Sequence, residues 1–97
     1  MIVADYVGVP AVLEQTAEEC VELAQACLKM ARKLRNENPT PANMDDILKA
    51  LNTEMADVMV CMNAIVEAGV TSYEAIDSEY MIKENRWERR INDKESK

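Results

Sequence analysis

Apolar residues recur at helical spacing in three long segments of this chain. The first segment, about residues 10–36, keeps a heptad spacing through Leu13, Cys20, Cys27 and Leu34. The stripe also contains Leu23 and four small or half-polar residues: Thr16, Ala17, Ala24 and Ala31. The pattern predicts one long amphipathic helix, and its alanines would let a second helix approach closely.

The second segment runs from about Asn43 to Ala68. Asn43 is a good N-terminal cap, and Gly69 is a typical C-terminal stop. Its predicted buried stripe consists of Leu48, Leu51, Met55, Val58, Met59, Met62 and Val66. The Pro-containing stretch 38–41 before it is a helix breaker, so residues 36–43 are predicted to form a loop.

The third segment opens with Thr71-Ser72-Tyr73-Glu74, the pattern of a capping box. Its apolar stripe is Tyr73, Ile76, Tyr80, Trp87 and Ile91. Residues 1–9 have no usable periodicity and are expected to form an N-terminal arm, while residues 92–97 are expected to be a frayed tail. We therefore predict an all-α fold: a single domain over residues 1–97, built as an antiparallel helical bundle of three main helices.

Composition narrows the possible chemistry. The 97 residues contain no His, which excludes imidazole bases and HExxH zinc sites, and only two Gly, which excludes a Gly-rich phosphate loop. A formal net charge of −7 argues against general nucleic-acid binding. No signal peptide or membrane span is apparent. The three cysteines lack metal-type spacing and are expected to be reduced and buried, which favours a cytoplasmic location.

Two pairs of acidic residues stand in the same phase on the first two helices. Glu19 and Glu22 form one pair, Glu54 and Asp57 form the other, and each pair has i, i+3 spacing. At 100° per residue, the first acid of each pair lies about 100° from the centre of its predicted stripe. If the helices pack side by side, four carboxylates converge at the edge of the bundle. Because such carboxylates repel one another unless a cation compensates them, the pattern predicts a site for Mg²⁺, Mn²⁺ or Ca²⁺.

Basic residues lie where they could meet an anion. Lys33 has the same helical phase as Glu22, but it also suits the negative end of the helix dipole. Lys83 occupies an apolar position of the third helix, where it either extends outward to solvent or points at an anionic ligand. The positive charges nearby favour the second alternative, an anionic ligand; they belong to Arg86, Arg89 and Arg90.

The order Glu18-Glu19-x-x-Glu22 followed by Glu54-x-x-Asp57 resembles the motif of the MazG-like, all-α nucleoside triphosphate pyrophosphohydrolase superfamily. The basic segment 83–89 is also similar, and the likeness extends over about residues 10–91. It implies a four-helix-type core completed by dimerisation, as a homodimer or homotetramer. It also implies Mg²⁺-dependent cleavage of a nucleoside triphosphate to the monophosphate and pyrophosphate.

The resemblance also implies roles for particular residues. The metal ligands would be Glu19, Glu22, Glu54 and Asp57, with Glu18 and Glu19 taking part in catalysis. The phosphate contacts would come from Lys83, Asn85 and Arg86, with Lys33 as a further candidate. The motif does not identify the residues that recognise the base, for which Tyr6, Met30 and Trp87 are candidates.

Two rival functions stay open at this point. Phosphoribosyl-ATP pyrophosphohydrolase, an enzyme of histidine synthesis, resembles the chain in size, fold and acidic motifs. A helical dimer without catalytic activity, serving as a scaffold, would also fit the heptads and the Met-rich stripe.

Overall fold

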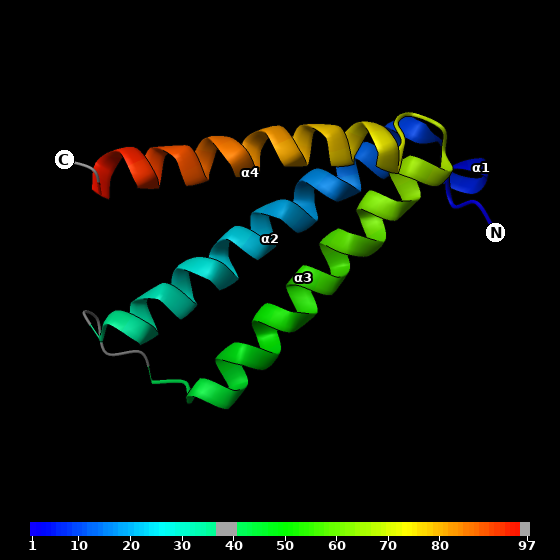
Figure 1. Ribbon diagram of the computed structural model, residues 1–97. Helices are drawn as coiled ribbons and strands as arrows, with labels where there is room; N and C mark the ends of the chain where they lie inside the picture. Colours follow the sequence, from blue (N-terminus) through cyan, green and yellow to red (C-terminus); the bar gives the residue numbers. More distant parts are fainter. Residues whose placement is uncertain (37–40, 96–97) are drawn as a thin grey trace.

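The computed structural model describes residues 1–36 and 41–95, and all of its regular structure is helical. Figure 1 shows four helices: α1 (Ala4–Val7), α2 (Val9–Arg35), α3 (Met44–Glu67) and α4 (Tyr73–Glu95). The predicted all-α fold with three long helices is therefore confirmed. The short α1 is an addition, since the N-terminal arm showed no helical pattern. The Pro-containing stretch predicted as a loop falls largely outside the described residues.

Local signals explain where α2 begins and ends. Gly8 precedes it with φ +86°, a conformation that other L-residues rarely adopt, and Pro10 occupies its first turn. At the other end Asn36 takes a left-handed conformation, and its backbone N–H donates to the Arg32 carbonyl at 2.9 Å. The basic last turn, which includes Arg35, is favourable at the negative end of the helix dipole.

Both later helices have side-chain caps. Asn43 Oδ1 accepts a hydrogen bond from the Asp46 N–H at 2.9 Å, as its position predicts. Ser72 Oγ accepts from the Ala75 N–H at 3.2 Å, so Ser72, rather than Thr71, caps α4. The predicted capping box was therefore wrong by one residue.

α4 also extends further than predicted. It continues to Glu95, so residues 92–95 are helical rather than frayed. Lys94 in its last turn stabilises the negative end of the dipole.

The core lies between α2 and α3, which run antiparallel (Figure 1). Its buried side chains are Val12 from α2 and Ile47 and Val58 from α3. The predicted stripes are only partly in this interface. Leu23 and Leu51 are half-buried, but much of the rest is exposed: Leu13, Ala17, Cys20, Ala24, Cys27, Leu34, Leu48, Met55, Met59 and Met62.

The buried side of each helix is therefore rotated away from the predicted stripe and towards the acidic pairs. A pair of helices buries only one side of each member, so the exposed members of the predicted stripes form a second apolar face. The expectation that Cys20 and Cys27 are buried was wrong for the same reason, because both thiols are free and exposed on that face.

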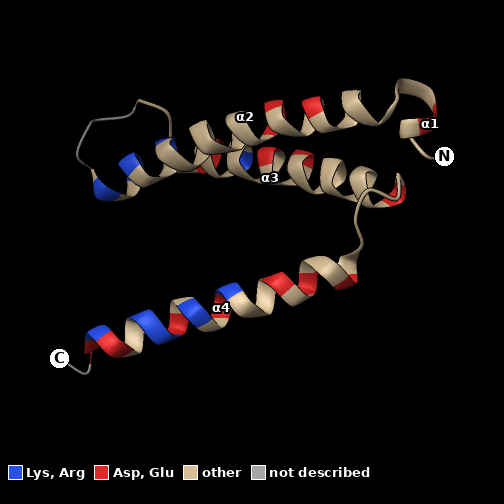
Figure 2. Ribbon diagram, turned by 90° about the horizontal axis from the view of Figure 1, so that it is seen from above, with Lys and Arg blue, Asp and Glu red and all other residues tan. Residues whose placement is uncertain are grey.

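α4 does not pack along α2 or α3. Figure 2 shows it leaving the α2–α3 pair after the turn that follows α3. Near that turn the Tyr73 hydroxyl donates to Asn63 Oδ1 at 2.6 Å, which ties the start of α4 to α3. The side chains from residue 77 to the end of the described helix are all exposed, including Trp87.

The whole chain is consequently too extended for a compact monomer. Its radius of gyration is 17.4 Å, against about 13 Å for a compact domain of this length. Its accessible surface is 7763 Å², roughly 2,200 Å² more than the ~5,600 Å² expected for a folded monomer of its mass. Among the described residues no helix is both long and apolar enough to cross a membrane.

Candidate metal centre

The acidic residues of α2 and α3 meet in the middle of the helix pair (Figure 2). One carboxylate oxygen from each of Glu19, Glu22 and Glu54 lies within 4.8 Å of the other two. Glu19 and Glu54 are half-buried, whereas Glu22 is exposed. The cluster therefore lies at the boundary between the α2–α3 interface and solvent.

Two carboxylate oxygens of this cluster are buried without a hydrogen-bond partner among the described residues. Glu19 Oε2 and Glu54 Oε2 are shielded from solvent, and neither accepts a hydrogen bond within the described part of the chain. The other oxygen of Glu19, Oε1, accepts from the Gln15 amide at 2.8 Å. Because a buried carboxylate oxygen without a partner is costly, a proton, a cation or an ordered water molecule would stabilise each of these atoms.

The protonation of Glu19 reflects this environment. Burial is the main cause that raises the pKa of Glu19 above its ordinary value, and the charges of Glu22 and Asp57 raise it further. The hydrogen bond from Gln15 acts in the opposite direction. The negative charge of the folded site is thus unfavourable in the absence of a counter-charge.

The other two predicted acids are placed differently. Asp57 is half-buried, and its charge acts on Glu19, although it lies outside the tight group of three. Glu18 is exposed and lines a shallow surface hollow on α2 together with Val21, Glu22 and Gln25. Glu18 is therefore at the outer edge of the cluster rather than inside it.

The donor set fits a hard divalent cation. Its oxygens come only from carboxylates on two rigid helices, which suits Mg²⁺, Mn²⁺ or Ca²⁺ better than softer metals. The two unpartnered buried oxygens distinguish this cluster from an ordinary solvated acidic face. The site can hold a cation and through it a phosphate group.

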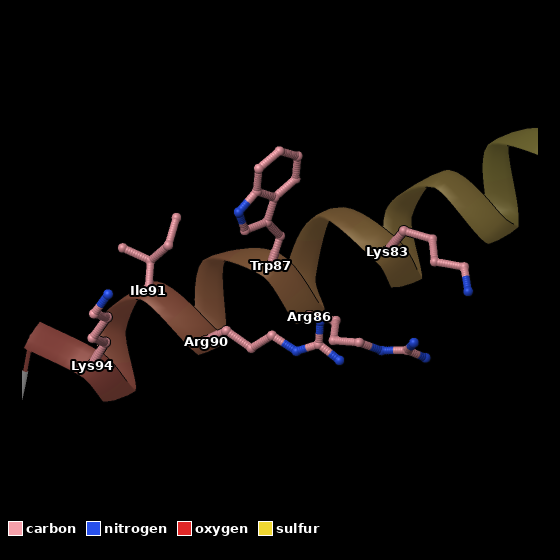
Figure 3. A pocket seen from close by; sticks show the side chains of 6 residues that line it. All are labelled: Lys83, Arg86, Trp87, Arg90, Ile91 and Lys94. Carbon is pink, nitrogen blue, oxygen red and sulfur yellow. The ribbon is translucent and has the colours of Figure 1, made fainter. Parts of the chain in front are cut away.

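The predicted basic residues lie elsewhere in a single copy. Figure 3 shows a hollow of about 380 Å³ on α4, lined by Lys83, Arg86, Trp87, Arg90, Ile91 and Lys94. The helix α4 itself lies apart from α2 and α3 (Figure 2), and Asn85 is also exposed on α4. One copy of the chain therefore does not bring these residues to the carboxylates.

Lys33 is also distant from the cluster. It shares the helical phase of Glu22, but it lies eleven positions later, which corresponds to about 16 Å along α2. The angular position of a residue around a helix does not give its distance along the helix axis, so the prediction for Lys33 did not include this separation.

The residues considered for base recognition do not form one site. Tyr6 and Trp87 are largely exposed, on α1 and α4, and Met30 is half-buried near the end of α2. Sequence reasoning instead missed Gln15, whose amide contacts Glu19. Its position four residues before Glu19 on the same helix was the available indication.

Comparisons with protein-family models, with curated proteins and with solved structures found no match to this chain.

Proposed function

We propose that this protein is a Mg²⁺-dependent nucleoside triphosphate pyrophosphohydrolase of the MazG-like, all-α type. The reaction would convert a ribo- or deoxyribonucleoside triphosphate and water to the monophosphate and pyrophosphate. One observation supports this proposal above the others. Carboxylates from two helices converge within 4.8 Å, and two of their oxygens are buried without a hydrogen-bond partner.

In this proposal Glu19, Glu22 and Glu54 hold the ion, and Asp57 adds negative charge beside them. Mg²⁺ would supply charge stabilisation for a phosphoryl group and lower the pKa of a bound water; Mn²⁺ could replace it. Gln15 holds the Glu19 carboxylate in a fixed orientation through its 2.8 Å hydrogen bond. Glu18, at the outer edge, is in a position to orient the attacking water.

We also propose that the active form is a homodimer, or a tetramer of two dimers. Its support is the surface excess of roughly 2,200 Å². That area suits an obligate interface, in which each partner buries on the order of 1,000–2,500 Å². The apolar face that includes Cys20, Ala24 and Cys27 on α2 supplies a surface of suitable composition.

A second copy would also account for the basic residues of α4. Lys83 and Arg86 carry the charge needed to bind a triphosphate, yet they lie on α4, which leaves the α2–α3 pair that holds the acidic cluster (Figure 2). In a dimer, α4 of one copy can pack beside α2 and α3 of the other. The phosphate contacts would then come from the partner subunit.

The decisive experiment measures pyrophosphate release from a panel of ribo- and deoxyribonucleoside triphosphates and from phosphoribosyl-ATP, with and without Mg²⁺. Turnover confined to phosphoribosyl-ATP would assign the chain to the rival enzyme. Glu22→Gln and Asp57→Asn should each reduce kcat/KM by about 100-fold or more, because charge stabilisation in the transition state is lost. Both variants should keep the helical circular dichroism of the wild type.

Glu14→Gln is the matched control, since it removes one charge from an exposed position on α2 outside the cluster. It should retain wild-type turnover. Equal activity in all four proteins would refute the assigned roles. The absence of Mg²⁺-dependent turnover on every substrate would favour the scaffold.

A further inference from the structure

A second feature adjoins the acidic cluster: an apolar pocket of about 290 Å³ between α1, α2 and α3. Its lining residues are Val3, Val7, Ala11, Val12, Gln15, Val60, Cys61 and Ala64. Among the described residues, no charged side chain lines it. Ligand sites combine such walls with a few polar groups that fix orientation, and here the main polar group is the amide of Gln15.

Gln15 connects this pocket to the acidic cluster. Its side chain lines the pocket and donates to Glu19 Oε1 at 2.8 Å. The two residues are four apart on α2, which corresponds to about 6 Å along the helix. A ligand with an anionic group at the cluster and a neutral group one helical turn away could therefore occupy both.

We infer that this pocket receives the nucleobase of the substrate and that Gln15 contacts the edge of the base. This inference rests on the proposed function, because it takes the phosphates of the same nucleotide to lie at Glu19, Glu22 and Glu54. A volume of about 290 Å³ is near the small end of the range for ligand sites, ~300–1,000 Å³. The pocket therefore suits a single heterocycle rather than a whole triphosphate.

The hydrogen-bonding groups and the neutrality of the pocket lining suit a nucleobase. The Gln15 amide carbonyl and its second N–H form no hydrogen bond within the described residues, and they offer one acceptor and one donor side by side. Base edges present the complementary pattern. Burial raises the pKa of the Cys61 thiol, so this wall stays neutral at physiological pH and suits an uncharged ring.

Filling the pocket tests the inference. Ala64→Leu and Ala11→Leu each add an aliphatic side chain to the lining, and Ala11 is exposed, so its replacement should leave the fold intact. Each should raise KM for the preferred nucleoside triphosphate by at least about tenfold, as differences of one or two methylenes do in a fitted pocket. Inhibition by inorganic pyrophosphate, which has no base, should be unchanged. Ala50→Leu, exposed and remote on α3, is the matched control.

A second measurement separates this inference from the proposed function. Saturation-transfer NMR without metal would report binding of adenosine, guanosine, cytidine, uridine and thymidine. At least one nucleoside should bind the wild type and Ala50→Leu, but neither pocket variant. That result without any triphosphate turnover would support the pocket and refute the hydrolase.

Three outcomes would overturn the inference. In the first, turnover occurs but both pocket variants retain the wild-type KM. In the second, the wild type binds no nucleoside and hydrolyses no nucleotide. In the third, Ala64→Leu and Ala11→Leu change the oligomeric mass, which would show that a second copy fills the pocket.

Discussion

Replacing Glu54 by Gln should change stability in opposite directions with and without Mg²⁺. In the wild type without metal, the carboxylates of Glu19, Glu22 and Glu54 repel one another, and Glu54 Oε2 is buried without a partner. The substitution removes one of these charges while keeping the shape of the side chain. It also removes one of the three proposed ligands.

The expected sizes of the two effects differ. Relief of repulsion is on the scale of a single charge pair near the surface, about 0.5 kcal/mol, which raises Tm by about 2–4 °C. An ion that binds only the folded state at ten times its Kd contributes about 1.4 kcal/mol. For a domain of this size that contribution corresponds to a rise of about 6–11 °C in the wild type. The variant should lose most of this rise.

The assay is thermal unfolding followed by circular dichroism, with EDTA or with MgCl₂ at equal ionic strength and fixed protein concentration. Glu14→Gln serves as the control, because it removes the same charge outside the cluster and should follow the wild type in Mg²⁺. Equal Mg²⁺-induced shifts in all three proteins would refute the reasoning, because the ion would then act only by general screening.

Two further predictions concern pH and assembly. Burial is the main cause of the raised pKa of Glu19. The contribution of protonated Glu19 to folding stability is therefore fully present below its ordinary pKa near 4.5, and it is lost as the pH rises through the raised pKa. Without metal, Tm should therefore fall over that interval in the wild type and less in Glu19→Gln; in Mg²⁺ the ion replaces the proton and the fall should disappear. An identical pH profile for the two proteins in EDTA would contradict this account. If the wild type is the proposed dimer or tetramer, Ala24→Glu should convert it to a monomer in light scattering, because the substitution places a charge on the exposed apolar face. The neighbouring Gln25→Glu should leave the mass unchanged. A wild-type mass of 10.9 kDa would count against the dimer.

Local patterns in the amino-acid sequence determined most of the secondary structure. The cap at Asn43 follows from that residue's own hydrogen-bonding capacity, and the end of α3 near Gly69 follows from its freedom to adopt a positive φ. The proximity of Glu19 and Glu54 could also be predicted from the sequence, because two acidic pairs in the same helical phase meet when their helices pack side by side. The helix ends depend on neighbours within a few residues, whereas the meeting of Glu19 and Glu54 also requires the two helices to pack together.

Only the tertiary structure decided which side of each helix is buried. Val12 and Ile47 lie in the core, while Leu13 and Leu48, one residue later in each helix, are exposed. Periodicity defines an apolar face, but it does not tell whether that face meets the neighbouring helix or another surface. The rotation brings Glu19 and Glu54 into the interface, where burial raises the pKa of Glu19.

The placement of α4 and the apolar pocket also depended on the fold. Lys83 and Glu22 look compatible by charge, but the path of the chain after Gly69 carries α4 away from the cluster. Gln15 gains its contact with Glu19 within α2, yet the pocket beside it exists only because α1 and α3 pack around the same segment. Distances between separate helices come from packing, and spacing along one helix contains no information about them.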